Sequence, residues 1–240
     1  STEMALFVNV GTFLLSAGLM LFLPNQIRLG SHESSSLAWR TVIKDWHAVW
    51  TFSKVALPFV VVYMVFQVVM LLTAALDSTE VAFAKEVLHL TDAAYGSLVS
   101  VAGIGFLVGA VCTNLVIKLM SAKQLMCSGT ILVSTGYVIY SLSMNYLVAS
   151  CGCFILCFSL ALANTGFMTY IQENIPIDMM GRISSLFGMV IHSLQLLAVL
   201  IIGVAAHWFS VQAVVIGVSV VMLSVAFLLI VTVTRLPKPK

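Results

Sequence analysis

The sequence predicts an all-α protein that crosses a membrane seven times. Its composition is 61% apolar and 8% charged, with a mean hydropathy of +1.11, whereas ordinary soluble domains are about 25% charged. Five stretches contain no Lys, Arg, Asp or Glu: residues 4–27, 55–76, 93–117, 124–172 and 183–234. These stretches are apolar all round, as in a bundle of membrane helices, and lack the polar and apolar alternation of a membrane β-barrel.

The number of spans follows from the length of these stretches. A helix needs about 20 apolar residues to cross the hydrocarbon core, so three stretches hold one span each and the two long ones hold two. Polar and aromatic residues divide the long stretches at residues 143–146 and 207–210, a composition that suits the headgroup region. The predicted spans are residues 4–24, 52–76, 94–118, 124–143, 147–171, 183–206 and 211–234.

Basic residues predict the orientation of the chain. Of the 11 Lys and Arg residues, all but Lys85 fall on one side of the predicted spans. Cytoplasmic loops carry an excess of Lys and Arg, so we expect the carboxyl terminus in the cytoplasm and the amino terminus of this chain outside a plasma or inner cell membrane. The residues on the basic side are Arg28, Arg40, Lys44, Lys54, Lys118, Lys123, Arg182, Arg235, Lys238 and Lys240.

An outward amino terminus needs a translocation signal, but the chain begins Ser-Thr-Glu-Met without a basic leader or a cleavage site. We therefore expect that earlier spans of a longer protein precede this chain. The alternative is a natural protein of seven spans with its amino terminus outside.

The longest polar interruption, residues 25–51, suits a cytoplasmic linker. Its tryptophans suit an amphipathic segment at the membrane interface; they are Trp39, Trp46 and Trp50. We predict three parts for the chain: residues 1–27 as the last helix of a missing amino-terminal bundle, residues 28–51 as the linker, and residues 52–240 as a carboxyl-terminal bundle of six helices.

Three segments carry a family resemblance. They are residues 9–17 (Asn-Val-Gly-Thr-Phe-Leu-Leu-Ser-Ala) with the later Leu23-Pro24, residues 90–109, which begin Leu-Thr-Asp-Ala-Ala-Tyr-Gly, and residues 172–182 (Gln-Glu-Asn-Ile-Pro-Ile-Asp-Met-Met-Gly-Arg). In this order they resemble the sixth helix, the entry into the eighth helix, and the loop between the tenth and eleventh helices of the major facilitator superfamily, in its multidrug and macrolide exporter branch. The resemblance covers residues 4–235 and implies the carboxyl-terminal half of a transporter, from its sixth helix to its end.

The predicted span 94–118 contains a stretch of small residues. Gly103, Gly105 and Gly109 remove side chains from this helix, so that a neighbouring helix can approach closely. Packing is the simplest role for them, and a gate made of sliding helices would need the same smooth contact. Thr91 or Asp92 can cap the first turn of the helix.

The loop at residues 172–182 is predicted to be a hinge. Pro176 lacks an amide donor and keeps the residue before it out of a helix, so the preceding span ends there. Asp178 can cap the next helix, Gly181 permits a close approach, and Arg182 can meet headgroup phosphates or helix carbonyls. The resemblance implies that this loop takes part in closing a cytoplasmic gate.

Polar side chains within spans are costly and tend to face a cavity or a partner. Tyr63, Gln67 and Met70 share one helix face, and His192 and Gln195 are neighbours on another helix. An apolar wall with a few polar groups is typical of small-molecule pockets, while helix packing with satisfied amides is the alternative. The polar candidates are Tyr63, Gln67, Asn114, Tyr137, Asn164, Thr165, His192 and Gln195, and the predicted substrate-binding residues are Tyr63, Gln67, Met70, Asn164, His192 and Gln195.

Proton coupling has one candidate group within the predicted spans. An unperturbed imidazole titrates near neutral pH, at about 6.5, so His192 could carry a proton, although a hydrogen bond to Gln195 is the simpler role. No Asp or Glu falls within a predicted span. If transport is proton-driven, the carboxylate is therefore expected in the missing half.

Other chemistry finds no support in the sequence. The 5 cysteines lack a paired C-x-x-C spacing with His partners, and there is no glycine-rich phosphate loop and no convincing pair of nucleophile and base. We expect no metal site, no cofactor, no nucleic-acid partner and no enzymatic activity. The basic carboxyl-terminal tail suits membrane lipid headgroups.

The sequence therefore predicts a secondary active transporter that exports amphipathic drugs or other small molecules by alternating access, as a drug-resistance efflux protein or antiporter. Its partners would be membrane lipids, the substrate and the missing amino-terminal half, with a proton as the candidate coupling ion. The alternatives are a seven-span receptor or signalling protein, and a lipid flippase on the same fold.

Overall fold

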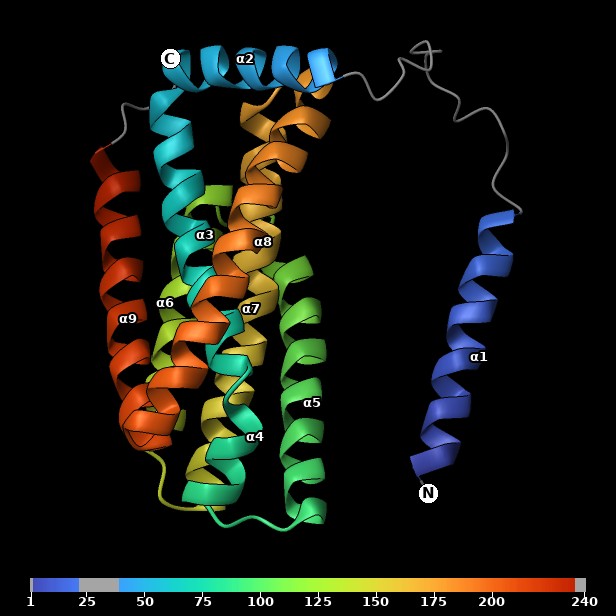
Figure 1. Ribbon diagram of the computed structural model, residues 1–240, viewed down its shortest axis with the longest axis vertical. Helices are drawn as coiled ribbons and strands as arrows, with labels where there is room; N and C mark the ends of the chain where they lie inside the picture. The colour runs from blue at the N-terminus through green and yellow to red at the C-terminus, as the bar shows by residue number, and fades with distance from the viewer. Residues whose placement is uncertain (1, 22–38, 236–240) are drawn as a thin grey trace. The chain divides into compact units, whose positions relative to one another are not determined.

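The computed structural model describes residues 2–21 and 39–235 of the chain. Every element in these two ranges is helical, which confirms the predicted all-α class (Figure 1). The chain divides into two compact units, Ser1–Lys44 and Asp45–Lys240.

In the first unit, the helix α1 spans Thr2–Leu21. It covers the predicted span at residues 4–24 as far as Leu21. The motif at Leu23-Pro24, the predicted linker up to residue 38 and the basic tail at residues 236–240 lie outside the described residues. The assignment of α1 to another bundle stays a prediction.

α2, Trp39–Val55, is a separate helix where the sequence predicted the end of a linker and the start of a span. α3 follows it as Leu57–Asp77, so the predicted span start at residue 52 was wrong. Pro58 explains the break. It lies in the first turn of α3, where its missing N–H has no helical partner to lose, whereas in a continuous helix its ring would clash with the carbonyl of Lys54.

After α3 the chain reverses through α4, Glu80–Ala82, and the π-helical turn η2, Phe83–Val87. Thr91 then caps the next helix by accepting a hydrogen bond from the N–H of Ala94 at 3.3 Å. The long helices that follow are α5 Asp92–Val116, α6 Ala122–Ser141, α7 Tyr146–Asn174, α8 Ile177–Trp208 and α9 Val211–Arg235.

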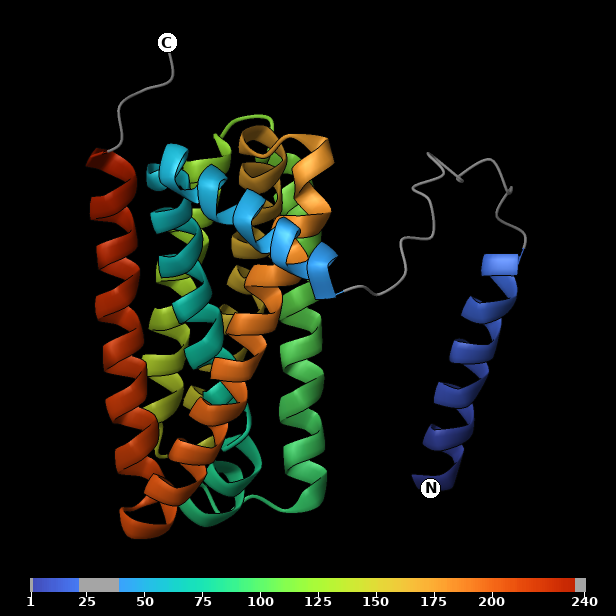
Figure 2. The same cartoon turned by 45° about the horizontal axis from the view of Figure 1, so that its top comes forward.

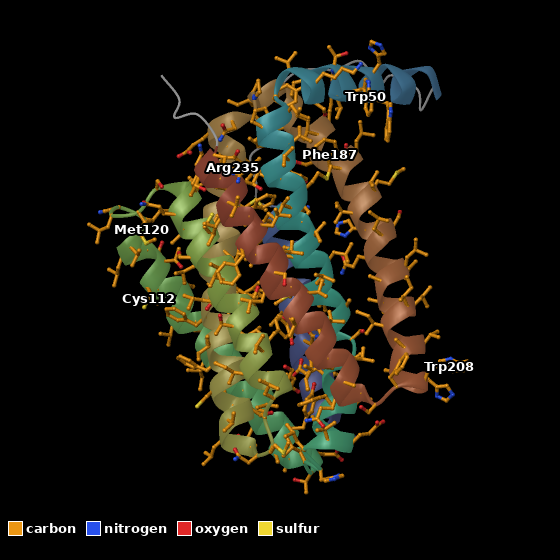
Figure 3. All side chains as sticks on the ribbon, turned by 90° about the vertical axis from the view of Figure 1, so that its left-hand side faces the viewer. Trp50, Cys112, Met120, Phe187, Trp208 and Arg235 are labelled. Atoms are coloured by element: carbon orange, nitrogen blue, oxygen red, sulfur yellow. The ribbon has the colours of Figure 1, made fainter. Side chains whose placement is uncertain are left out.

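Together with α3, these helices run alternately in opposite directions. We call the end that holds α4 the α4 end. The opposite end is crossed by α2 from Asp45 onward, and we call it the α2 end (Figure 2). Lys85 lies at the α4 end, whereas the other described basic residues of this unit lie at the α2 end: Lys54, Lys118, Lys123, Arg182 and Arg235. Figure 3 shows Arg235 near one end and Trp208 at the other.

Five helices in the described part of the chain are long and apolar enough to cross a membrane: α3, α5, α7, α8 from Met179 onward, and α9. The protein is therefore a multi-pass membrane protein. α6 has the length of a span but carries several hydroxyl groups, of which Thr130, Ser134 and Ser141 are buried against other helices. The apolar part of α1, Asn9–Met20, is shorter. Seven spans remain a prediction.

α5 and α7 pack with their backbones in close contact. A Cβ atom added to Gly105 would lie 2.6 Å from the carbonyl oxygen of Phe154, and one added to Gly109 would overlap the carbonyl of Phe158. These two glycines are one helical turn apart and form the small-residue contact that membrane helices use. Gly103 is not part of this contact, because a Cβ there would meet no atom within 4 Å.

α6 packs just as closely on α7, through four glycines that the sequence analysis did not single out. A Cβ added to Gly136 would lie 2.7 Å from the backbone nitrogen of Leu156, and one added to Gly152 would lie 2.8 Å from that of Tyr140. The other two glycines, Gly129 and Gly166, meet backbone atoms of Ala163 and Met126. α7 is therefore held by direct backbone contact on two sides.

In the hinge predicted at residues 172–182, the preceding helix ends before Pro176 as expected, but the next helix begins earlier than predicted. α7 ends at Asn174, and α8 begins at Ile177 with Pro176, not Asp178, in the N-cap position. The side chain of Asp178 lies outside the described residues. The carbonyl of Pro176 accepts the N–H groups of Met179 and Met180 at 2.9 and 3.1 Å. Because proline cannot donate but can accept, the turn starts on its carbonyl.

The glycine contact between α5 and α7 gives the first testable prediction. Gly109→Ala should destabilise the helix packing by about 1–3 kcal/mol, because the new methyl group meets backbone that cannot rotate away. Gly103→Ala is the matched control on the same helix and should be neutral or slightly stabilising, since it gains helix propensity in open space. Unfolding of the purified chain in mixed micelles measures both. Equal effects of the two substitutions would contradict the contact.

Candidate functional site

Three helices meet in an aromatic cluster in the half of the bundle nearer the α2 end. Tyr63 of α3 is 4% exposed, and its ring centroid lies 5.3 Å from that of Phe167 on α7 and 5.2 Å from that of Phe187 on α8. Phe66 stacks on Phe167 at 4.0 Å, and Phe59 packs against Tyr63 at 6.0 Å. We call these five residues the Tyr63 cluster. It joins α3, α7 and α8 through ring contacts of the kind that stabilise apolar cores.

Gln67 supplies an amide at the edge of the Tyr63 cluster. Its Nε2 donates to the hydroxyl of Tyr63 at 3.4 Å, and the side chain is half-buried. The bond is long and stays within α3, so Gln67 keeps hydrogen-bonding capacity for another partner. Met70, one turn further along, is partly buried and packs against the core. The structure therefore places three of the predicted substrate residues on one helix face.

His192 and Gln195 also pair within their own helix, with 3.2 Å between His192 Nδ1 and Gln195 Oε1. Phe187 marks the side of α8 that faces α3. At about 100° per residue, His192 points about 140° away from that side and Gln195 only about 80° away. Burial agrees, since His192 is exposed and Gln195 is half-buried. These two residues therefore border the Tyr63 cluster unequally, and Gln195 lies nearer to it.

Asn164 is exposed on α7, about one turn before Phe167 of the Tyr63 cluster. Its neighbour Thr165 satisfies its own hydroxyl on the carbonyl of Ala161 at 2.9 Å. The exposed amide of Asn164 therefore lies three residues before Phe167 on α7 and is accessible to another molecule. A single cavity shared by the faces of α3 and α8 stays a prediction.

The residues predicted for gating fall into two groups. Gly105 and Gly109 lie in the contact between α5 and α7, where they join the two helices rather than leave a gap. Gly103 and Gly181 face open space, with no atom within 4 Å of an added Cβ. Pro176 precedes the first turn of α8, and Arg182 is exposed one turn into that helix, at the α2 end. A gating role for this loop stays a prediction.

A small cavity near the α4 end was missed by the sequence analysis, and we call it the acidic cavity because Asp77 and Glu80 are among its lining residues. Its volume is about 60 Å³. The hydroxyl of Tyr137 on α6 donates a hydrogen bond to Oδ1 of Asp77, the last residue of α3. Tyr140 donates to the backbone carbonyl of Glu80 at 3.5 Å. The lining residues are Leu76, Asp77, Thr79, Glu80, Ala102, Tyr137, Tyr140, Cys153, Leu156, Cys157 and Val215.

The length of α3 corrects the expectation that every acidic residue lies outside the spans. α3 extends to Asp77, which belongs to the apolar helix long enough to cross a membrane. The sequence placed Asp77 one residue beyond its span and gave it no partner, because Tyr137 is 60 residues away along the chain. The available signal was Tyr137 itself, a polar residue within a span, which needed a partner somewhere.

The family of the chain follows from comparison with known proteins. The sequence model of the family described as Major Facilitator Superfamily matches residues 2–199, which is more than half of the chain. The chain therefore belongs to the major facilitator superfamily. The members of this superfamily are membrane transporters and not enzymes. Comparisons with curated proteins and with solved structures gave no match.

The Tyr63 cluster gives the second testable prediction. Phe167→Ala should cost about 3–5 kcal/mol of stability, because it removes the ring on which Phe66 stacks and leaves a void beside Tyr63. Met168→Ala is the control, since Met168 is the next residue on α7 and is 57% exposed. Unfolding in mixed micelles measures both variants. A loss at Phe167 no larger than that at Met168 would show that the cluster does not hold the three helices together.

Proposed function

We propose that this protein is a secondary active transporter that exports amphipathic small molecules by alternating access. The observation that carries the proposal is the family match over residues 2–199, which assigns the chain to a superfamily of membrane transporters. The face of α3 beside the Tyr63 cluster supports the choice of substrate, because the partly buried Gln67 and Met70 place an amide next to apolar surface. Such a face suits compounds that are mostly apolar with a few polar groups.

The proposed substrate contacts come from three helices. Tyr63, Gln67 and Met70 would form the wall on α3, Asn164 would extend it on α7, and Gln195 would continue it on α8. His192 turns further from α3 and would meet the substrate or water from the exposed side of α8. Hydrogen bonds from such amides are worth more in a site without water than at a surface, so each amide would select among related compounds.

We also propose that α3 and α5–α9 form one half of the transporter and that a second bundle of six helices, ending in α1, completes it. Of the five described spans, α8 and α5 bury the smallest shares of their apolar windows, 11% and 17%. These two helices therefore present the most surface for contacts outside the bundle. In this fold class two bundles rock around a midplane site between them, and the second bundle would cover part of this surface.

The orientation that we propose places the α2 end in the cytoplasm of a cell that exports across its plasma or inner membrane. Five of the described basic residues lie at that end and Lys85 lies at the other, and cytoplasmic ends carry the excess of Lys and Arg. Trp46 and Trp50 of α2 are exposed at the same end, and Lys54 lies 5.5 Å from the ring centroid of Trp50. A helix with these residues suits the lipid headgroup region.

One observation favours a second candidate, the flipping of lipids. An apolar cavity of about 240 Å³ lies between α2, α3 and α8, with Trp50 and Phe187 among its lining residues (Figure 3). An acyl chain would suit such a lining. Export of soluble amphipathic compounds and movement of labelled lipids in the same vesicles distinguish the two candidates.

The substrate proposal predicts that Gln67→Leu and Gln195→Leu change which compounds are exported. Each change removes one amide from the wall while keeping the size of the side chain, so compounds that bond to that amide should be exported about fivefold to tenfold less well, as expected for a bond worth about 1 kcal/mol or slightly more. Resistance profiles of cells that express the intact transporter at equal levels measure the effect. The matched control is Gln212→Leu on α9, outside the wall. Identical profiles for all three variants would reject the wall and leave these glutamines as packing residues.

The orientation predicts opposite accessibility of two loops. In a background without native cysteines, Lys85→Cys should react with a membrane-impermeant thiol reagent in intact cells, and Lys118→Cys should react only after the membrane is opened. Both side chains are exposed in the structure and lie at opposite ends of α5, so they serve as controls for each other. The reverse pattern would invert the proposed topology.

A further inference from the structure

The acidic cavity near the α4 end is lined by two carboxyl groups, which the sequence analysis did not place between helices. Asp77 and Glu80 both line its volume of about 60 Å³. Asp77 ends α3, and Glu80 begins α4 after a turn. Both residues therefore border one small space between helices, which is open to water on the side of Asp77.

Nothing in the described residues neutralises these two acids. Lys85, the basic residue at this end, forms its ion pair with Asp92 at 3.0 Å instead. The other ionisable groups that face the cavity are uncharged hydroxyls and thiols. They are Tyr137 and Tyr140 from α6 and Cys153 and Cys157 from α7, while α5 contributes Ala102 and α9 contributes Val215. Tyr95 of α5 does not line the cavity but lies close enough to Glu80 to interact with it electrostatically. Glu86 on η2 is exposed and adds negative charge rather than removing it.

Two like charges in a small cavity disfavour each other. Burial raises the pKa of Glu80, and the negative charge of Asp77 raises it further. A carboxyl pair in such a place keeps one proton more readily than either group does alone.

We propose that Asp77 and Glu80 form a proton-binding site that holds one proton between them, and that the hydroxyl of Tyr137 responds to its occupancy. This site lies in the bundle described here, whereas the sequence assigned any coupling carboxylate to a missing half. The proposal concerns binding of a proton and stands whether or not the exported compound is identified.

Tyr137 can respond to the proton because its hydroxyl has two hydrogen-bond acceptors within reach. Its hydroxyl donates to Oδ1 of Asp77 and also lies 3.4 Å from the backbone carbonyl of Thr73. When the proton resides on Asp77, the carboxyl O–H can donate to the oxygen of Tyr137, and Tyr137 can donate to Thr73 instead. Protonation forms one O–H bond on the carboxyl of Asp77, with a proton that water outside gives up, and all other changes are exchanges of hydrogen bonds. Tyr137 is 3% exposed, so packing keeps its ring in place and its hydroxyl stays within reach of both acceptors.

The site has access to its proton and a link to the rest of the bundle. Asp77 is exposed on one side, so water at the α4 end reaches the carboxyl. On the inner side, the hydroxyl of Thr73 lies 3.7 Å from the sulfur of Met222 on α9. The exchange at Tyr137 would therefore act where α3, α6 and α9 come together, because it changes the contact between α3 and α6.

Infrared difference spectroscopy of the purified full chain in lipid nanodiscs tests the site. A protonated carboxyl has a distinct C=O band. We expect one such band to persist at pH values above the ordinary carboxyl range of about 4. Its midpoint should fall in Asp77→Asn and in Glu80→Gln, because the remaining acid loses its negative neighbour. Glu173→Gln, at the exposed α2 end, is the control and should change nothing.

Tyr137→Phe separates this role from simple packing. The hydroxyl bond favours the ionised form of Asp77, so its loss should raise the midpoint of the carboxyl band rather than lower it. A purely structural tyrosine would not move the midpoint. If Asp77→Asn fails to fold, the opposite shifts of Glu80→Gln and Tyr137→Phe still carry the test.

Stability gives a second measurement. A group that binds its proton more tightly in the folded state adds stability at low pH, and this stability is lost as the pH rises through the midpoint of the folded state. The melting temperature of the chain should therefore fall over that pH range, and Glu80→Gln should flatten the dependence. A carboxyl band with an ordinary midpoint in all variants would overturn the site. A band that sodium chloride removes at constant pH would also overturn it, in favour of a metal cation. Neither result depends on export, so the proposed function is tested separately.

Discussion

Direct backbone contact on α7 is the constraint on which the rest of the bundle depends. α5 approaches it through Gly105 and Gly109, and α6 approaches it through a second set of glycines, so three helices sit closer together than side chains would allow. In hydrocarbon there is little hydrophobic force to bring helices together, and this close fit supplies dispersion and dipole contacts instead. α3 reaches α7 through ring contacts with Phe167, and α9 packs on α6 and α3, so these helices build outward from the three that are in backbone contact.

Two regions that we propose to be functional are bordered by this helix, one in each half of the bundle. Phe167 carries the Tyr63 cluster, and Cys153 with Leu156 lines the acidic cavity. α3 borders both, since Tyr63 and Asp77 are 14 residues apart on it, or about 21 Å at 1.5 Å per residue. α3 is therefore the element through which a change of contact in one region would act on the other.

The sequence predicted most of this fold because hydrocarbon thickness fixes helix length. The span predicted at residues 211–234 corresponds to α9, Val211–Arg235, and the span predicted at 94–118 is offset from α5 by two residues. The separate helix α2 was missed because Pro58 divides a run that reads as continuous by composition. Contacts between distant segments were not predictable from one sequence. The partner of Asp77 is one example, and the difference between Gly103 in open space and Gly109 against backbone is another.

The contact between Thr73 and Met222 has a consequence for how the protein is made. These residues are 149 positions apart, so α3 emerges from the ribosome long before the helix that covers it. Until then, the side chain of Thr73, a residue that is 5% exposed in the finished bundle, faces lipid or the insertion machinery. Thr73 also donates to the carbonyl of Val69 within its own helix at 3.0 Å. The early helix thus satisfies its own polar group during synthesis and can wait in the membrane until its last partner arrives.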